Sequence, residues 1–351
     1  MLYNRSMKFI RKTLSLLLIC ILLVGCSSAK HYIAYTIYPI GYILNRVGGN
    51  KINAVSIQTN DLVQLSKIKD DYKDTLNDSM VLFRVGGLEP YMDLYDDDIK
   101  ETGVNIQDLS VLNALYQYKR YTPVIVDGKM NFVEGEYYEN DIFKEIDTYD
   151  FDPFIWLSPI GMCSMAKDVK EYLSSNYFEQ SEYFNENFEK FQDELIALDA
   201  AYNALSLQLI NQNKTIKFVS MTGSFGTWQK DYGFQVYPVC LSKYGALPSD
   251  EQLNIIKQKI VNDNVHYIAY EQNMSEDMKD LFKQLEEELD LQRVTLHNIS
   301  SLTSSQSESG KDYLSLMYEN LSILQNMTEE ISAPITQEEP IVVENSEIVE
   351  E

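Results

Sequence analysis

One periodic stretch of apolar residues restricts the architectures that this chain can adopt. Between residues 184 and 209, large apolar side chains recur at alternating steps of four and three residues. The eight positions are Phe184, Phe188, Phe191, Leu195, Leu198, Tyr202, Leu205 and Leu209. This spacing predicts one helix of roughly 30 residues with a continuous apolar face. That face packs either against the rest of the chain or against a second helix in a coiled coil or dimer.

Alternating strands and helices flank this helix on both sides. Before it, predicted strands cover residues 32–36, 52–57, 80–85 and 104–109, with helices at 40–47 and 90–100. Residues 119–151 have no sustained period and predict a long loop with a hairpin, after which Pro159 opens a helix that reaches residue 174. After it, predicted strands cover 215–220, 234–240, 266–270 and 293–297, with helices at 249–262, 276–290 and 312–328. Such alternation is typical of parallel α/β packing.

The two ends of the chain differ from this pattern. Four basic residues precede an apolar run at 14–24 that is too short to span a membrane comfortably, so residues 1–25 are expected to be a secretory signal. The next residues, Leu23-Val24-Gly25-Cys26, resemble a bacterial lipobox, which implies a lipid on Cys26 and a tether at 26–31. An ordinary signal with an incidental cysteine is the alternative. Residues 331–351 are rich in glutamate and predict a disordered acidic tail.

Charge and cysteine content exclude some partners and leave one question open. The formal net charge of −24 disfavours binding to nucleic acid or to anionic lipid headgroups. In an exported protein Cys163 and Cys240 either form a disulfide or stay reduced, and the sequence does not choose between these states. No nucleophile elbow, phosphate loop, His-Glu-x-x-His pair or dinucleotide fingerprint is present, so the chain is expected to bind rather than catalyse.

Residues 152–159 carry the most specific motif. Their sequence, Asp-Pro-Phe-Ile-Trp-Leu-Ser-Pro, resembles the Asp-Pro-His-Ile-Trp-Leu-Asp-Pro segment of the substrate-binding proteins of zinc and manganese ABC importers. Further segments are similar to that family in the same order, at 35–40, 47–55, 85–91, 223–226, 231–234 and 310–321. The resemblance implies two Rossmann-like α/β lobes joined by one long helix, with a ligand cleft between the lobes. It divides the chain into an N-terminal lobe at 32–175, a linking helix at 176–212 and a C-terminal lobe at 213–330.

The same resemblance places four metal-ligand positions in that cleft. Here they fall on the loop near Asp61, which lacks a histidine, and on Phe154, Thr222 and His297. Only His297 is a strong donor, and Asp61 and Glu271 are the remaining candidates to lie near it. Because a zinc site needs about three or four donors at fixed distances, we expect zinc or manganese to bind weakly and no cofactor to be certain.

The resemblance implies a lipid-anchored solute-binding protein on the outer face of the cell membrane, monomeric, with an ABC permease as partner and an altered metal site. A cell-surface adhesion role on the same fold is the alternative, and a hydrolase is a third hypothesis. Four aromatic residues either line the cleft for an organic ligand or plug it. They are Tyr38, Phe154, Trp228 and Tyr270.

Overall fold

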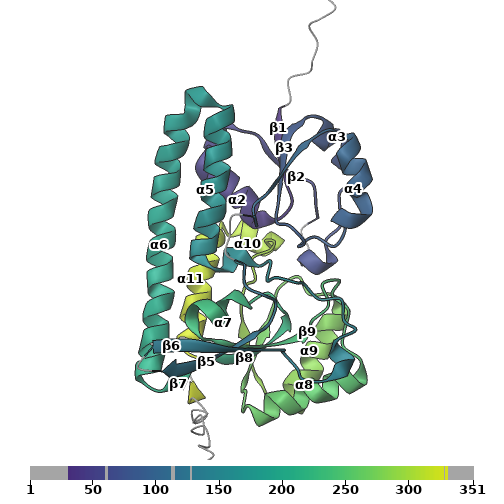
Figure 1. The fold of residues 1–351 in the computed structure, drawn as a ribbon, viewed down its shortest axis with the longest axis vertical. Coiled ribbons are helices and arrows are strands. Elements are labelled where there is room, and N and C mark those ends of the chain that lie inside the picture. The colour runs from purple at the N-terminus through teal and green to yellow at the C-terminus, as the bar shows by residue number, and fades with distance from the viewer. Residues whose placement is uncertain (1–30, 60–61, 112–114, 127–128, 328, 331–351) are drawn as a thin grey trace, which may run out of the picture.

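The computed structural model describes residues 31–59, 62–111, 115–126, 129–327 and 329–330. Its two main sheets are parallel and four-stranded, one in each of two lobes (Figure 1). The first contains β1 (Tyr32–Tyr35), β2 (Ala54–Ser56), β3 (Ser79–Arg84) and β4 (Asn105–Asp108). The second contains β8 (Lys217–Thr222), β9 (Gln235–Cys240), β10 (Tyr267–Tyr270) and β11 (Gln292–Thr295). The predicted α/β architecture of two lobes is confirmed.

The two sheets share one topology. Their strand orders are β2-β1-β3-β4 and β11-β10-β8-β9, so in each the first strand of the lobe lies between the second and the third. The order therefore reverses between β1 and β3, where Ala34 is opposite Leu82, and between β8 and β10, where Val219 is opposite Ile268. In open α/β sheets, the crevice at the carboxyl ends of the strands at such a reversal is where ligands bind.

Ten helices of at least five residues surround the sheets in the described part of the chain. In the first lobe they are α2 (Tyr38–Gly48), α3 (Tyr72–Asn77) and α4 (Met92–Glu101). Next in the chain are α5 (Pro159–Asn176) and α6 (Ser181–Asn211). The helices of the second lobe are α7 (Thr227–Tyr232), α8 (Asp250–Asn262), α9 (Glu276–Glu288), α10 (Ser304–Glu308) and α11 (Tyr313–Leu324). Of the helices described, none combines the length and the apolar character that crossing a bilayer requires.

Helix α6 is the predicted long helix, and all eight residues of its apolar face are buried in this chain. It runs along the side of both lobes, and α5 packs against it (Figure 1). One hydrogen bond ties it to α2 (Asn187 Nδ2 to the Val47 carbonyl, 3.1 Å) and another to α11 (Tyr202 Oη to the Met317 carbonyl, 2.8 Å). The apolar face is therefore filled by the protein's own lobes, and the coiled-coil alternative has no free seam to use.

The predicted hairpin in residues 119–151 is formed by β5 (Arg120–Val126) and β6 (Lys129–Gly135), which pair antiparallel. It lies against the second lobe although it precedes α6 in the chain (Figure 1). Arg120 donates to Tyr237 Oη at 2.8 Å and forms an ion pair with Asp263 at 3.2 Å. The lobe boundaries at 32–175 and 213–330 therefore stay a prediction, since this segment packs across them.

Most of the short elements of the structure were not predicted. Helix α3 has six residues and α10 has five, which is too short for an apolar period to repeat. Helix α7, also of six residues, lies where the family resemblance implied a turn and a helix at the start of the second lobe. Two-residue strands β7 (Lys214–Thr215) and β12 (Glu329–Glu330) pair antiparallel, and brief 3₁₀ turns include η4 (Ile155–Leu157). Apolar packing joins both lobes in one continuous core, and a smaller core lies between the first sheet and helices α3 and α4.

We predict that Leu195→Ala lowers the free energy of unfolding by about 3 kcal/mol, because Leu195 is fully buried between α6 and the lobes. Leu207→Ala, in the same helix but 61% exposed, should cost less than about 0.5 kcal/mol. Urea unfolding monitored by circular dichroism measures both. Equal losses in the two variants would contradict the assignment of α6 as a helix buried along one face.

Candidate functional site

The carboxyl ends of β8, β10 and β11 meet at one edge of the second sheet, where the strand order reverses. Thr222 ends β8 and Glu271 directly follows β10. Glu271 Oε1 accepts from the Thr222 backbone N–H at 2.8 Å, and Oε2 accepts from the Thr222 hydroxyl at 2.7 Å. Asn298, in the loop after β11, donates its side-chain amide to Oε2 at 2.9 Å. The structure therefore brings together two of the predicted site residues, Thr222 and Glu271, in a closed hydrogen-bond network.

This network extends from Glu271 into the loop after β11 and the turn after β8. Asn298 Oδ1 accepts in turn from the Ser300 backbone N–H and hydroxyl, at 3.1 and 3.0 Å. The Ser224 hydroxyl lies 2.6 Å from that of Thr222. Burial raises the pKa of Glu271, while the hydrogen bonds from Asn298 and Thr222 lower it by less. The carboxylate of Glu271 thus connects three strand ends.

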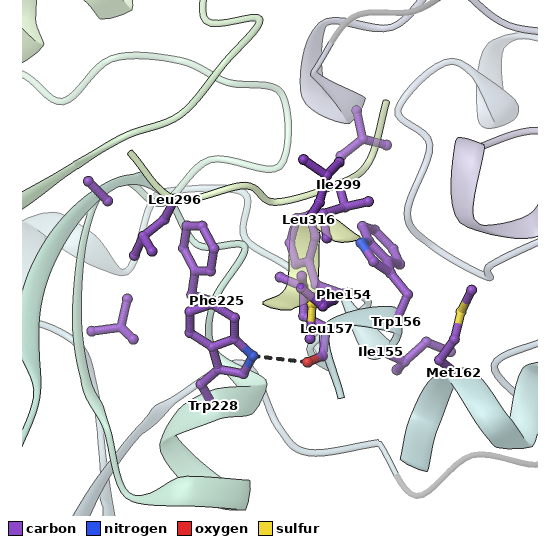
Figure 2. Close-up of a cluster of buried hydrophobic side chains, with 14 of the residues drawn as sticks. Phe154, Ile155, Trp156, Leu157, Met162, Phe225, Trp228, Leu296, Ile299 and Leu316 are labelled. Carbon is purple, nitrogen blue, oxygen red and sulfur yellow. Dashed lines mark hydrogen bonds between the residues drawn. The ribbon is translucent and has the colours of Figure 1, made fainter. Parts of the chain in front are cut away.

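Phe154 lies inside the protein, with none of its surface exposed. Its ring meets those of Tyr149 and Trp156 edge-on, at centroid distances of 5.8 and 5.4 Å. Figure 2 shows it within a cluster of buried apolar side chains that comes from both lobes. The segment following it is fixed by hydrogen bonds, one of which runs from Trp228 Nε1 to the Leu157 carbonyl at 2.9 Å. Phe154 is therefore a core residue that fills the space between the lobes.

His297 is directed toward helices α10 and α11. Its Nδ1 lies 3.2 Å from Gln306 Nε2, and its Nε2 lies 3.3 Å from Glu319 Oε2. Burial lowers the pKa of His297, and the nearby Glu319 carboxylate raises it by less. Both ring nitrogens have protein partners, and among the described residues no hydrogen bond or ion pair joins this ring to Glu271. The pairing of these two residues as metal ligands stays a prediction without geometric support.

Asp61, the remaining candidate metal ligand, lies outside the described residues, and the loop that contains it is described only in part. Next to it, Gln58 is buried and accepts from Tyr91 Oη at 2.6 Å. Within the described ranges, no three His, Cys, Asp or Glu side chains converge closely enough to hold a metal ion. Both described cysteines are unpaired, Cys163 half-buried in α5 and Cys240 buried at the end of β9.

A cavity of about 780 Å³ lies between the lobes. Tyr35, Tyr38 and Ser56 contribute from the first lobe, and Asn273 and the 302–308 segment from the second. Its walls carry mainly hydroxyl groups, together with two tyrosine rings, one amide, the Leu302 side chain and one carboxyl group, that of Glu308. Of the four aromatic residues considered from the sequence, Tyr38 lines this cavity, Phe154 and Trp228 are buried in the core, and Tyr270 packs on Phe282.

Glu89 is a buried acid that sequence reasoning did not single out. It follows β3 at the strand reversal of the first sheet, the counterpart of the place that Glu271 has in the second. Both carboxyl oxygens of Glu89 are buried without a hydrogen-bond partner in the described structure, and burial raises the pKa of Glu89 to about 7. The sequence offers one indication of this acid, the Gly-Gly-Leu-Glu-Pro segment at 86–90. Its two glycines indicate a turn after a strand, and a carboxyl group that follows such a turn lies near the edge of the sheet.

We predict that Glu89→Gln flattens the pH dependence of stability. A carboxyl whose pKa is about 7 when folded and near 4.5 when unfolded stabilises the fold fully below about pH 4.5, and this contribution is lost as the pH rises to about 7. The substitution should remove about 3 kcal/mol of the fall between pH 5 and 8. Urea unfolding across this range measures it, with Glu189→Gln on the exposed face of α6 as control. An unchanged slope in Glu89→Gln would exclude this assignment.

The fold has known relatives among bacterial metal-uptake proteins. Zinc-binding lipoprotein AdcA of Streptococcus pneumoniae is 25% identical over 350 residues, covering 97% of this chain and 65% of that protein. High-affinity zinc uptake system protein ZnuA of Bacillus subtilis is 23% identical over 179 residues, or 51% of this chain and 54% of that protein. The chain thus spans slightly less than two thirds of the length of AdcA and about half that of ZnuA.

Solved structures agree on the fold. The Zn(II)-bound ZnuA-like domain of Streptococcus pneumoniae AdcA superposes with a TM-score of 0.62 at 21% identity, covering 85% of this chain and 99% of that one. The laminin-binding protein Lmb of Streptococcus agalactiae gives 0.65 at 16% identity, covering 85% and 99%. A family model described as the zinc-uptake complex component A periplasmic matches residues 33–327. This chain therefore belongs to the zinc-uptake complex component A family.

Proposed function

We propose that this chain is the solute-binding component of an ABC importer of the zinc-uptake type, held on the outer face of the cell membrane by a lipid on Cys26. Family membership over residues 33–327 supports the transport role. The leader at 1–25 and the Leu-Val-Gly-Cys sequence that follows support export and lipidation. A relative named as a zinc-binding lipoprotein, aligned along 97% of this chain, agrees with both. A monomer docking on a membrane permease is the corresponding assembly.

In this proposal the site between the lobes is no longer a tight zinc site. The observation that carries this part is the position of Phe154, which has no lone pair to donate and is enclosed by aromatic rings. Around it, Thr222 and Glu271 are hydrogen-bonded to each other, and His297 is engaged by α10 and α11. A zinc ion bound there would have to displace these partners before it gained any ligand.

The cavity of about 780 Å³ is then the place where a solute would contact both lobes. Its hydroxyl groups and the two tyrosines suit a polar molecule better than a bare divalent cation, which prefers several carboxylate, imidazole or thiolate ligands. The lobes already contact each other beside it, since the Tyr38 backbone N–H donates to the Ser300 carbonyl at 3.2 Å.

Surface adhesion is the second candidate. Laminin-binding proteins share this fold, with Lmb giving a TM-score of 0.65, but at 16% identity the likeness concerns the fold alone. The two roles differ in the partner: a transport component requires the permease, whereas an adhesin binds an extracellular surface without it. Two results together would favour adhesion. The purified chain would retain laminin, and cells would bind laminin equally well with and without the permease gene.

We predict that the purified chain binds zinc more weakly than about 1 µM, which corresponds to roughly −8 kcal/mol, and that His297→Ala leaves this affinity unchanged. The reason is that both ring nitrogens of His297 already have protein partners. Isothermal titration in metal-buffered solution measures the affinity, with the exposed His266→Ala as matched control. Stoichiometric binding tighter than this limit that is lost in His297→Ala alone would overturn the altered-site proposal.

We predict that Cys26→Ala abolishes membrane attachment while the signal is still cleaved, because the thiol of Cys26 is the only group in the Leu-Val-Gly-Cys sequence that can carry the lipid. Cell fractionation followed by mass spectrometry of the N-terminus measures both events. Cys163→Ala serves as the control, since this half-buried thiol in α5 is remote in sequence from the leader. A Cys26→Ala protein that remains in the membrane fraction after cleavage would refute lipidation.

A further inference from the structure

The cavity of about 780 Å³ between the lobes is lined by polar groups that the protein leaves without partners. Ser304, Ser305 and Ser307 line it from α10, and within the described part of the chain their hydroxyls form no hydrogen bond. All three residues are exposed, in contrast to the buried Thr222–Glu271 network. Each hydroxyl can therefore donate one hydrogen bond to a ligand and accept others from it.

The charge of the cavity restricts the class of ligand. Among the described lining residues Glu308 is the only charged one, and its carboxyl group forms no ion pair or hydrogen bond with the described residues. A phosphate or carboxylate group would face this carboxyl group and the net charge of −24 without a positive partner. One carboxyl group is also too few to hold a divalent cation. The other lining groups are neutral, so most of the contacts open to a ligand suit an uncharged molecule.

The wall formed by the first lobe supplies aromatic surface. Tyr35 and Tyr38 are half-buried there, and helix α2 holds both rings in place. The Tyr35 ring lies so close to Gly41 that a Cβ atom at this residue would come within 2.5 Å of Tyr35 Cζ, and the Tyr38 ring has its centroid 6.1 Å from that of Tyr42. Leu302 adds apolar surface from the second lobe. Such walls suit a molecule with an apolar face and polar edges.

A sugar carries both kinds of surface. One face of a pyranose ring presents C–H groups, which pack on aromatic rings, and its edge carries several hydroxyls that each donate and accept. The two oxygens of the Glu308 carboxylate can accept from neighbouring hydroxyls of such a ring. The volume of the cavity lies in the upper part of the range of ligand pockets, about 300–1,000 Å³, which leaves room for one or two sugar rings.

We propose that this cavity binds a neutral mono- or disaccharide. The C–H face of the sugar packs on Tyr35 and Tyr38, and its hydroxyls exchange hydrogen bonds with the serines of α10 and donate to Glu308. Because the rings come from the first lobe and the hydroxyls of α10 from the second, the sugar contacts both lobes. It would be the solute of the proposed function, on which this assignment rests.

Isothermal titration of the purified full-length chain tests the proposal with glucose, galactose, mannose, N-acetylglucosamine, maltose, lactose and sucrose. We expect saturable one-to-one binding of at least one of these sugars, and no binding of glucose 6-phosphate, galacturonate or glucosamine, which are charged. Glu308→Ala should weaken sugar binding about ten-fold or more, because the hydroxyls of the sugar lose a charged acceptor. Glu287→Ala, the same change at an exposed position of α9, should alter it less than about two-fold.

A second variant tests the location of the site. Ser304→Trp in α10 places a large ring in the cavity and should also weaken binding about ten-fold or more. Ser322→Trp at an exposed position of α11 should leave binding unchanged, and circular dichroism confirms the fold of both variants. No saturable binding of any of the neutral sugars would overturn the proposal. So would equal binding of the charged sugars, equal losses in Glu308→Ala and Glu287→Ala, or full binding in Ser304→Trp.

Cross-linking in cells, followed by mass spectrometry, distinguishes this proposal from the transport role on which it rests. Cross-links between the chain and an ABC permease, combined with no sugar binding by the purified chain, would overturn the sugar assignment and leave the transport role standing. Sugar binding without any cross-link to a permease would support the site and overturn the transport role alone.

Discussion

The two lobes are held together by the buried segment Phe154–Leu157, and the rest of the structure depends on how this segment is satisfied. Trp156 donates its indole N–H to the Asn298 carbonyl at 2.8 Å, and the Trp156 carbonyl accepts from Tyr313 Oη at 2.6 Å. The Leu157 carbonyl accepts from Trp228 at 2.9 Å. Tyr313 and Trp228 thus supply the hydrogen-bond donors that two carbonyls of this buried 3₁₀ turn need, the indole N–H of Trp156 has its own acceptor, and the three rings exclude water. The lobes therefore meet through a continuous core, which restricts their relative movement.

Each lobe also closes its own strand-reversal crevice with an acid. Glu271 in the second lobe receives hydrogen bonds from Thr222 and Asn298, whereas Glu89 in the first has its pKa raised to about 7. At neutral pH one carboxylate is stabilised by donors and the other is close to half protonated. The hydrogen bonds lower the cost of a buried charge on Glu271, whereas Glu89, whose buried oxygens have no hydrogen-bond partner in the described structure, avoids part of that cost by binding a proton. The positions where an α/β sheet most readily binds a ligand are therefore occupied by protein groups.

The sequence predicted the parts of this fold whose signals repeat. Helix α6 has 31 residues and its apolar positions recur from residue 184 to residue 209, and most strands of both sheets are short apolar runs bounded by turns. A pattern that repeats in this way identifies an element more reliably than any single residue does. The sequence did not predict α3 and α10, which are too short for an apolar period to repeat. Nor did it predict the direction of His297, because this depends on Gln306 and Glu319, which only the folded chain brings near. Glu89 and Asp152 were hidden for a related reason: burial of an acid depends on tertiary packing.

Phe154 and the Thr222–Glu271–Asn298 network are physically coupled under the proposed function. A histidine in a dry interior is stable when both ring nitrogens have partners, and a bound cation provides one of them. Without that cation, a phenyl ring at residue 154 fills the space at no polar cost. The carboxylate of Glu271 would then lack a positive partner, and the Thr222 hydroxyl and the Asn298 amide supply neutral donors in its place. Under the proposed function these residues are therefore compatible with one another without a tightly bound metal, and recovering such a site would require concerted changes in both lobes.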